Sequence, residues 1–301
     1  MGETMRGKRI GIIVIVLLLV GGGAYGFSQL HQQGTRTTHQ RPAQSASSTT
    51  SSATTRSSAG TKRAQAVQTV LNHYRGTKNI GVAYVDLTSG ASASLHGKTT
   101  FYAASVAKLP VVAYVQQAIM MRQLTWTTTF PYADAANQVP NAMVSGGTGT
   151  LQNENHQGKT YAVADLLQRT VEQSDNQASN QLLYHVALQN KTAFTQYLHQ
   201  HMGMSNYSKQ MSALQANRAI MTVWQQNQKA SNWLQNTDWA HDKIGTLPVK
   251  VAHKIGINGA ANNDAAIVLG KHQFALTIMT DGWTDAQIAT LATQVYEATE
   301  K

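Results

Sequence analysis

The chain has 301 residues, a formal net charge of +10 and no cysteine. The lack of cysteine excludes a disulfide framework, a cysteine nucleophile, a lipid-modified cysteine anchor and a zinc site built from cysteines. Residues 1–85 hold ten Lys or Arg and one acid, whereas residues 86–301 hold fourteen and thirteen. The larger part is almost neutral and lacks the basic surface that nucleic-acid-binding proteins carry, so we expect no nucleic-acid partner.

An apolar segment spans residues 10–27, directly after three basic residues between positions 6 and 9. Its length, about 18 residues, is near the lower limit for crossing a bilayer, and the preceding charges favour a cytoplasmic N-terminus. We therefore expect residues 1–27 to form a cytoplasmic stub and a signal anchor, a single transmembrane segment that leaves the rest of the chain outside the cell membrane. Small residues at positions 21–24 keep the alternative open that the signal is cleaved and the protein secreted.

Residues 28–60 are rich in Ser, Thr and Gln. Such a segment buries too little apolar surface to offset its loss of conformational entropy, so it is predicted to be a flexible linker. The positive charge of this N-terminal part suits contact with anionic lipids or anionic cell-wall polymers.

Residues 61–301 are predicted to form one folded domain, large enough for a core without disulfides. Its expected elements are, in chain order, a helix at 61–74, strands at 80–87 and 91–96, helices at 105–122, 163–173, 177–186, 191–201 and 213–228, strands at 249–254, 265–269 and 273–279, and a helix at 284–299. Strands from both ends must pair across the helical middle. The expected fold class is α+β, one antiparallel sheet flanked by helices.

Three short polar motifs occur in a fixed order: Ser105-Val106-Ala107-Lys108, Ser174-Asp175-Asn176 and Lys254-Ile255-Gly256. Each motif alone is common, since a serine is a frequent helix cap and Ser-Asp-Asn a frequent turn. The ordered set is much rarer. On a helix, Ser105 and Lys108 share one face, and an amine beside a hydroxyl is one way to activate a serine nucleophile.

These motifs resemble those of the class A β-lactamases and penicillin-binding proteins, which carry Ser-x-x-Lys, Ser-Asp-Asn and Lys-Thr-Gly. The likeness extends to the residues around the motifs, at 101–110, 146–151 and 262–266, and so covers nearly all of residues 61–301. The resemblance implies the β-lactamase/transpeptidase-like fold and a covalent acyl-enzyme mechanism.

Site residues follow from this resemblance. Ser105 is expected to attack a carbonyl and Lys108 to take its proton, while Ser174 relays a proton to the leaving nitrogen. Asn176 is expected to hold the substrate amide or to orient Lys108, and Lys254 to supply positive potential. Gly256 and Ile257 are expected to line the substrate site, with the backbone N–H groups of Ser105 and Ile257 stabilising the oxyanion. Asp175 is expected to support its turn. No cofactor is implied, and the eleven histidines lack metal-ligand spacing.

Two departures from the family pattern stand out. Class A β-lactamases use a glutamate between the second and third motifs to activate the deacylating water, but here that interval contains only Asp238 and Asp242 as acids. Ile255 and Ile257 stand where hydroxyl side chains often bind the substrate carboxylate, so ordinary β-lactams should bind poorly unless another donor such as Asn258 compensates. Because the glutamate that activates the deacylating water is missing from this interval, we expect slow deacylation.

Three hypotheses remain open. The chain is an exported serine hydrolase acting on a β-lactam or related amide, a penicillin-binding-protein-like D-alanyl peptidase acting on a peptidoglycan-type substrate, or a non-catalytic wall-binding relative. The complete set of motifs favours the first.

Overall fold

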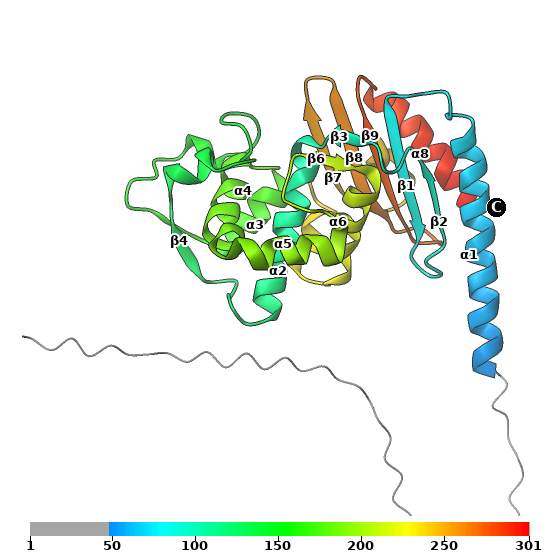
Figure 1. Cartoon of the computed structure of the whole chain (residues 1–301), viewed down its shortest axis with the longest axis horizontal. Helices are drawn as coiled ribbons and strands as arrows, with labels where there is room; N and C mark the ends of the chain where they lie inside the picture. The colour runs from blue at the N-terminus through cyan, green and yellow to red at the C-terminus, as the bar shows by residue number, and fades with distance from the viewer. Residues whose placement is uncertain (1–47, 301) are drawn as a thin grey trace, which may run out of the picture. The chain divides into compact units, whose positions relative to one another are not determined.

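The computed structural model describes residues 48–300 and forms one antiparallel sheet with helices on both faces (Figure 1). The five-stranded sheet has the order β2-β1-β9-β8-β7. Its strands are β1 (Ile80–Asp86), β2 (Ser92–Leu95), β7 (Val251–Asn258), β8 (Ala261–Val268) and β9 (Phe274–Thr280). The N-terminal hairpin β1–β2 pairs with β9 through β1, which confirms the predicted α+β class with strands from both ends of the chain in one sheet.

Two helices from opposite ends of the chain cover one face of the sheet, α1 (Ser48–Asn72) and α8 (Asp285–Glu300). Side chains such as Leu71 and Leu291 are fully buried between these helices and the strands. Complete burial of a leucine stabilises the fold by about 1.5–3 kcal/mol.

The other face of the sheet and the region beyond it form a second, larger core. Its helices are α2 (Leu109–Met120), α3 (Val163–Glu172), α4 (Asn176–Leu182), α5 (Lys191–Met202), α6 (Ala213–Gln225) and α7 (Lys229–Trp233). Three-residue strands form two further ribbons, β3 (Thr100–Tyr102) with β6 (Gln210–Ser212) and β4 (Thr129–Pro131) with β5 (Thr160–Ala162). These strands are too short for a periodic pattern, and the sequence did not predict them.

Helix α1 begins at Ser48, whereas the sequence predicted a flexible linker up to residue 60. Among the residues of this helix from 58 onward, Gly60 is the first buried one, which agrees with the predicted start of the packed domain. Once the packed part has nucleated a helix, further residues join at little cost, and Ala and Ser allow this. The rest of the predicted linker, the anchor and the stub lie outside the described residues. Among the helices of residues 48–300, none combines the length and apolar character needed to cross a bilayer.

The predicted helix at 105–122 is divided. A 3₁₀ helix, η1 (Ala104–Lys108), precedes α2, and Pro110 lies in the first turn of α2. Proline has no N–H to donate and its φ angle suits a first turn, so the regular helix begins at Leu109. The third motif also differs from expectation, because β7 continues through it to Asn258 and turns at residues 259–260 into β8.

Candidate active site

The first two motifs meet β7 at a pocket of about 260 Å³. Its lining comes from η1, the start of α4, β7 and two loops, and consists of Tyr102, Ala104, Ser105, Met143, Val144, Gly147, Thr148, Ser174, Asn176, Trp239, Ile255, Ile257 and Asn258. The sequence therefore predicted the residues at the base of the pocket, but several of its walls come from elsewhere in the chain.

Lys108 lies at the centre of the polar cluster beneath this pocket. Its Nζ is 2.8 Å from Ser105 Oγ, 3.0 Å from Ser174 Oγ, 2.5 Å from the Ser174 carbonyl oxygen and 2.7 Å from Asn176 Oδ1. The fold thus brings together four residues that the sequence singled out.

The protonation state of Lys108 follows from its surroundings. The side chain is fully buried, and this burial, together with the charge of Lys254, lowers its pKa well below the usual range, while Asp175 acts in the opposite sense. A neutral amine has two N–H groups and one lone pair. The carbonyl oxygens of Ser174 and Asn176 can only accept, so they take the two N–H groups. In this neutral form the lone pair is left for a serine hydroxyl, an arrangement in which Lys108 can accept a proton from Ser105.

The two serines of the cluster differ in access. Ser105 is partly exposed and lines the pocket, whereas Ser174 is 2% exposed. An acyl donor in the pocket therefore reaches Ser105 Oγ first. Ser174 Oγ, 3.0 Å from the same amine, is placed to pass a proton to or from Lys108.

The amide of Asn176 is fully used within the protein. Its Oδ1 accepts from Lys108, and its Nδ2 donates to the carbonyl oxygens of Val144 at 2.9 Å and Gly146 at 3.1 Å. Of the two roles that the sequence suggested for Asn176, the geometry matches the orientation of Lys108.

The backbone around both serines is unusual. Ala104, directly before Ser105, has φ 47°, and Ser174 has φ 52°. Non-glycine residues rarely adopt this left-handed region, and those that do are often held there at active sites. Asp175 supports the second turn, since its carboxylate accepts from Ala178 N at 2.9 Å, capping α4, and from Leu151 N at 2.8 Å. This is the structural role that the sequence predicted for it.

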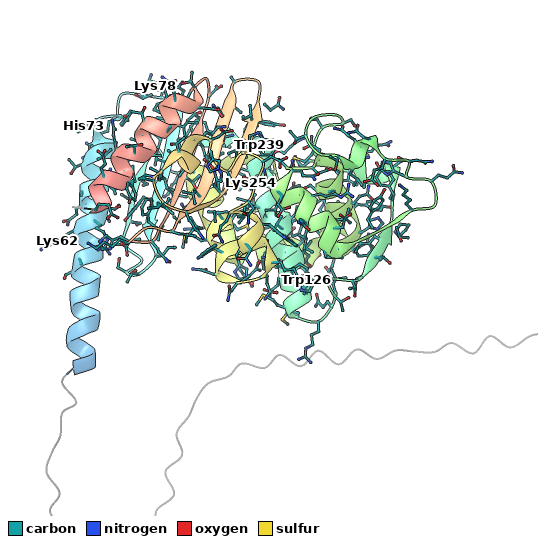
Figure 2. The ribbon with its side chains drawn as sticks, turned by 180° about the vertical axis from the view of Figure 1, so that it is seen from behind. Lys62, His73, Lys78, Trp126, Trp239 and Lys254 are labelled. Carbon is teal, nitrogen blue, oxygen red and sulfur yellow. The ribbon has the colours of Figure 1, made fainter. Side chains whose placement is uncertain are left out.

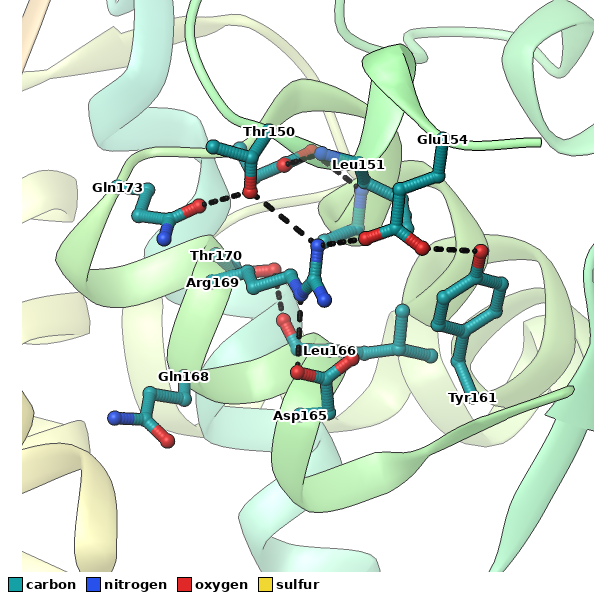
Figure 3. Close-up of polar contacts among 12 residues, drawn as sticks. Thr150, Leu151, Glu154, Tyr161, Asp165, Leu166, Gln168, Arg169, Thr170 and Gln173 are labelled. Atoms are coloured by element: carbon teal, nitrogen blue, oxygen red, sulfur yellow. Dashed lines mark hydrogen bonds and ion pairs between the residues drawn. The ribbon is translucent and has the colours of Figure 1, made fainter. Parts of the chain in front are cut away.

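A second set of polar contacts holds the loop in front of the second motif (Figure 3). The guanidinium of Arg169 in α3 lies 2.6 Å from Glu154 Oε1, 3.0 Å from Asp165 Oδ1 and 3.3 Å from Thr150 Oγ1. Tyr161 donates to the other oxygen of Glu154 at 2.9 Å. These contacts tie the loop that follows Gly149 to α3, the helix that ends at the second motif.

Strand β7 is the edge of the sheet next to η1. Asn258 pairs with Ala261 across a two-residue turn, and in such a hairpin the pair beside the turn is hydrogen-bonded. Pairs alternate from there, so the backbone N–H and C=O groups of Ile255 and Ile257 point away from β8. The Ile257 N–H is therefore free of the ladder on the side facing η1, as an oxyanion donor requires.

Gly256 is the position where β7 comes closest to the nucleophile. A Cβ atom there would lie 2.4 Å from the Ala103 carbonyl oxygen, 2.9 Å from Val106 N and 3.0 Å from Ser105 N. Only glycine allows the strand to approach the backbone of η1 so closely.

Gly256→Ala should therefore push β7 away from Ser105. We expect the acylation rate to fall by about two to three orders of magnitude, the loss typical of removing one oxyanion donor. Single-turnover acylation measures this effect. Gly76→Ala is the control, because a Cβ at Gly76 meets no atom within 4 Å. Equal acylation rates for the two variants would contradict this role of Gly256.

Lys254 is close to the pocket but does not line it. The side chain is 1% exposed, and its Nζ lies 5.6 Å from the centre of the Trp239 ring (Figure 2). Desolvation lowers the pKa of Lys254 to about 7, opposed by Asp264 and Asp238 and assisted by Lys243. The sequence expected Lys254 to supply positive potential; in the structure Trp239, and not Lys254, is among the residues that line the pocket.

The lowered pKa of Lys254 makes stability depend on pH. An unfolded lysine has a pKa of about 10.4, so between about pH 7 and pH 10 the unfolded state binds more protons than the folded state. The free energy of unfolding should therefore rise with pH in this window and carry the full penalty below pH 7. Compared with Lys254→Met, the wild type should gain about 2 kcal/mol from pH 7 to pH 9 in denaturant unfolding. Parallel pH profiles would contradict this.

No carboxylate lines the pocket. Helix α5 and strand β6 are joined by a short link, Gly203–Lys209, which contains no acid. Asn141 Nδ2 donates to the carbonyl oxygen of Tyr207 in this link at 3.1 Å. Glu172 is bonded to Gln168 at 2.8 Å and is absent from the pocket lining. Within residues 48–300, no group of three or more His, Asp or Glu side chains has metal-binding geometry.

Sequence reasoning missed part of the pocket. The sequence assigned no site role to Trp239, Met143 or Val144, which all line the pocket. The signal available for Val144 was its position two residues before Gly146, at the start of a loop that resembles the family. Nothing in the sequence indicated that Trp239, between α7 and β7, reaches the same pocket.

Comparison with known proteins identifies the family of this chain. Residues 62–299 match the model of the β-lactamase enzyme family. The fold is similar to PBP-A (TM-score 0.65, 19% identity, 78% of this chain and 96% of that one) and to a PBP-A variant solved as an acyl-enzyme complex with penicillin G (0.66, 20%, 78% and 96%). It is also similar to a β-lactamase from Sphaerobacter thermophilus DSM 20745 (0.64, 18%, 78% and 97%). No curated protein matches the sequence. The match over residues 62–299 establishes that this chain belongs to the β-lactamase enzyme family.

Proposed function

We propose that this protein is a serine acyl-transfer hydrolase that is acylated on Ser105 by a β-lactam or a related amide, including peptidoglycan-type substrates, and releases the acyl group slowly. One observation carries this proposal. A buried lysine holds its Nζ 2.8 Å from a partly exposed serine in a pocket that no carboxylate lines. The PBP-A variant with penicillin G bound as an acyl-enzyme supports the choice of substrate class.

Acylation uses the residues of the cluster in order. Ser105 Oγ attacks the carbonyl carbon while Lys108 Nζ accepts the hydroxyl proton. The negative charge on the carbonyl oxygen is stabilised by the backbone N–H groups of Ser105 and Ile257. The C–N bond then breaks, and the proton passes from Lys108 through Ser174 Oγ to the leaving nitrogen. The result is an ester on Ser105 and an amine, which departs from an open-chain amide but stays attached to the acyl group when a β-lactam ring opens.

Deacylation lacks an equivalent base. Water must attack the Ser105 ester, and a general base contributes about 10² to 10⁴ in rate. Among residues 48–300, no carboxylate lines the pocket that could activate this water. Release of the acyl group is therefore the slow step of the proposed cycle.

Intact-mass spectrometry of the full-length protein, incubated with penicillin and sampled over time, tests the proposal. A persistent mass increase equal to the whole drug supports acylation with slow release. A transient increase with accumulation of hydrolysed drug would show acylation with fast release and overturn the slow step. No increase with penicillin or with a non-lactam acyl donor would refute the acyl-enzyme proposal and favour a non-catalytic relative.

A D-alanyl peptidase is the second candidate, favoured by the lack of a deacylating carboxylate. Such an enzyme transfers or hydrolyses the acyl group of a peptide and is trapped by penicillin. Release of free D-alanine from a peptide ending in D-Ala-D-Ala distinguishes it. Release that requires Ser105 would support this candidate, and its absence in the presence of a penicillin adduct would favour the β-lactam-directed hydrolase.

Glu172→Gln should leave acylation and release rates within about twofold of the wild type. Glu172 is the glutamate nearest in sequence to the second motif, but its carboxylate bonds Gln168 and does not line the pocket. The same time course measures both rates. A large loss of release with unchanged acylation would identify Glu172 as the missing base and contradict slow, unassisted deacylation.

We also propose that the domain is exported and held at the cell membrane by residues 10–27. The basic residues before this apolar segment support the proposal. The positive charge of the N-terminal part of the chain suits contact with anionic lipids or cell-wall polymers. Protease treatment of intact cells tests it. Degradation of the domain with retention of a membrane fragment supports an anchor, release of intact domain into the medium supports cleavage, and protection in intact cells contradicts export.

A further inference from the structure

The pocket wall along β7 is apolar. Ile255 and Ile257 line it together with Trp239, and Val144 and Met143 lie in the same lining. Ile257 is 52% exposed and Val144 51%, which is unusual for large aliphatic side chains of this domain. Exposed apolar surface gathered at a pocket mouth marks a site that binds apolar groups.

The positively charged side chains near this apolar wall are not among the residues that line the pocket. Among the described residues, no Lys, Arg or His lines the pocket, and the ammonium of Lys254 in β7 is buried with its Nζ at 5.6 Å from the centre of the Trp239 ring. Lys108 is buried and bonded to both carbonyl oxygens of the cluster. The pocket therefore offers a negative group no exposed cation.

The polar groups that remain are neutral. Asn258 donates from Nδ2 to Tyr102 Oη at 3.4 Å, and both side chains line the pocket. Asn258 also lies on the opposite face of β7 from Ile255 and Ile257, because side chains alternate along a strand. It therefore does not restore a donor at the two isoleucine positions.

The position of the substrate follows from the acylation geometry. A carbonyl on Ser105 Oγ, with its oxygen at the Ser105 and Ile257 N–H groups, lies against the free edge of β7. The rest of the substrate extends past Ile255, Ile257 and Trp239. A carboxylate placed against Ile255 and Ile257 loses hydration without gaining a charged donor or a hydroxyl from these two side chains, whereas an uncharged apolar group gains contact.

We propose that this acyl site selects uncharged substrates, amides or esters that carry an apolar group in place of a carboxylate beside the scissile bond. The inference rests on the proposed acylation of Ser105 and uses the same step: Ser105 Oγ forms an ester with the acyl carbon, the C–N or C–O bond breaks, and the leaving nitrogen or oxygen takes the serine proton through Lys108.

Benzylpenicillin and its methyl ester form a matched pair of probes, since they differ by one methyl group that removes the charge beside the scissile bond. We expect the full-length protein to form the Ser105 adduct at least about tenfold faster with the ester, measured by intact mass at equal concentrations. Equal rates, or a faster reaction with the acid, would overturn the inference while leaving the proposed function intact. Absence of both adducts would overturn the proposed function and this inference with it.

Two variants test which residues cause the preference. Ile255→Thr adds a hydroxyl with little change in shape, and Trp239→Ala uncovers Lys254. Each should shift the ratio of ester to acid rates about tenfold toward the acid. Trp239→Phe keeps a ring over the lysine and should retain the preference. A ratio unchanged in both Ile255→Thr and Trp239→Ala would show that this wall does not select the substrate.

Met121→Thr is the control for these variants, because Met121 is an exposed residue just after α2 and is absent from the pocket lining. It makes a similar apolar-to-hydroxyl change and should leave the ratio of rates unchanged. Since both probes are measured on the same preparation, a loss of folded protein cancels in the ratio.

Discussion

Ser105→Ala is expected to abolish covalent labelling completely, whereas Ser174→Ala should still form the adduct, about two orders of magnitude more slowly. Both hydroxyls lie within hydrogen-bonding distance of Lys108 Nζ, at 2.8 Å and 3.0 Å, so distance alone does not distinguish them. Access does, because Ser105 lines the pocket in a partly exposed position and Ser174 is nearly buried. The comparison therefore separates the nucleophile from the proton relay.

Intact-mass spectrometry with the penicillin methyl ester, followed by peptide mapping of the adduct, measures both variants. The modified peptide should contain Ser105 in the wild type and in Ser174→Ala. An adduct that survives in Ser105→Ala, or that is lost only in Ser174→Ala, would show that Ser105 is not the nucleophile. Either result would contradict the proposed mechanism.

Lys108→Met should lower the acylation rate by about three to four orders of magnitude, near the upper end of what a general base contributes. Methionine fills a similar volume but cannot accept the Ser105 proton, and it removes the donor to Asn176 Oδ1 and one of the two donors to the Ser174 carbonyl oxygen, which keeps Thr148 Oγ1. In the wild type the rate should rise with pH as Lys108 loses its proton, with a midpoint well below the usual lysine pKa. In the variant this rise should disappear.

Lys108→Arg is the informative control. A guanidinium keeps the positive charge but does not release its proton in proteins. If Lys108 acts as a base, arginine should be as inactive as methionine. If the positive charge alone matters, arginine should retain most of the activity, and the proposed role of a neutral lysine would be wrong. Thermal unfolding of each variant shows whether a loss of rate reflects loss of the fold.

Most of the fold was predictable from local patterns. The strands at 80–87, 265–269 and 273–279 and the helices at 163–173 and 191–201 were expected nearly where the structure has them, because each shows clear apolar periodicity. The errors have local causes. Pro110 moved the start of α2, and packing in the domain extended helix α1 back to Ser48. The short ribbons have no periodic signal, since three residues pair only through contacts made elsewhere.

The candidate site, like the fold, was predicted from the sequence only in part. The sequence predicted the residues of the polar cluster because each belongs to a short motif with a characteristic chemistry: Ser105, Lys108, Ser174 and Asn176. Lys254 was named as well, but its burial could not be read from the motif, because whether a lysine is buried depends on the neighbouring side chains. Here one such neighbour is Trp239, which lies in a loop 15 residues earlier.

The sequence by itself determined the chemistry of the cluster: a serine, a lysine one helical turn later, a second serine with its asparagine, and no glutamate to complete a deacylating site. Side-chain identity and short spacing suffice to name these residues, because each motif spans no more than about one turn of backbone, although the fold brings the motifs together. Only the tertiary structure decided what the pocket presents to a substrate. Burial of Lys254 under Trp239 and the outward position of Ile257 depend on contacts between distant segments, and desolvation there changes both charge and affinity.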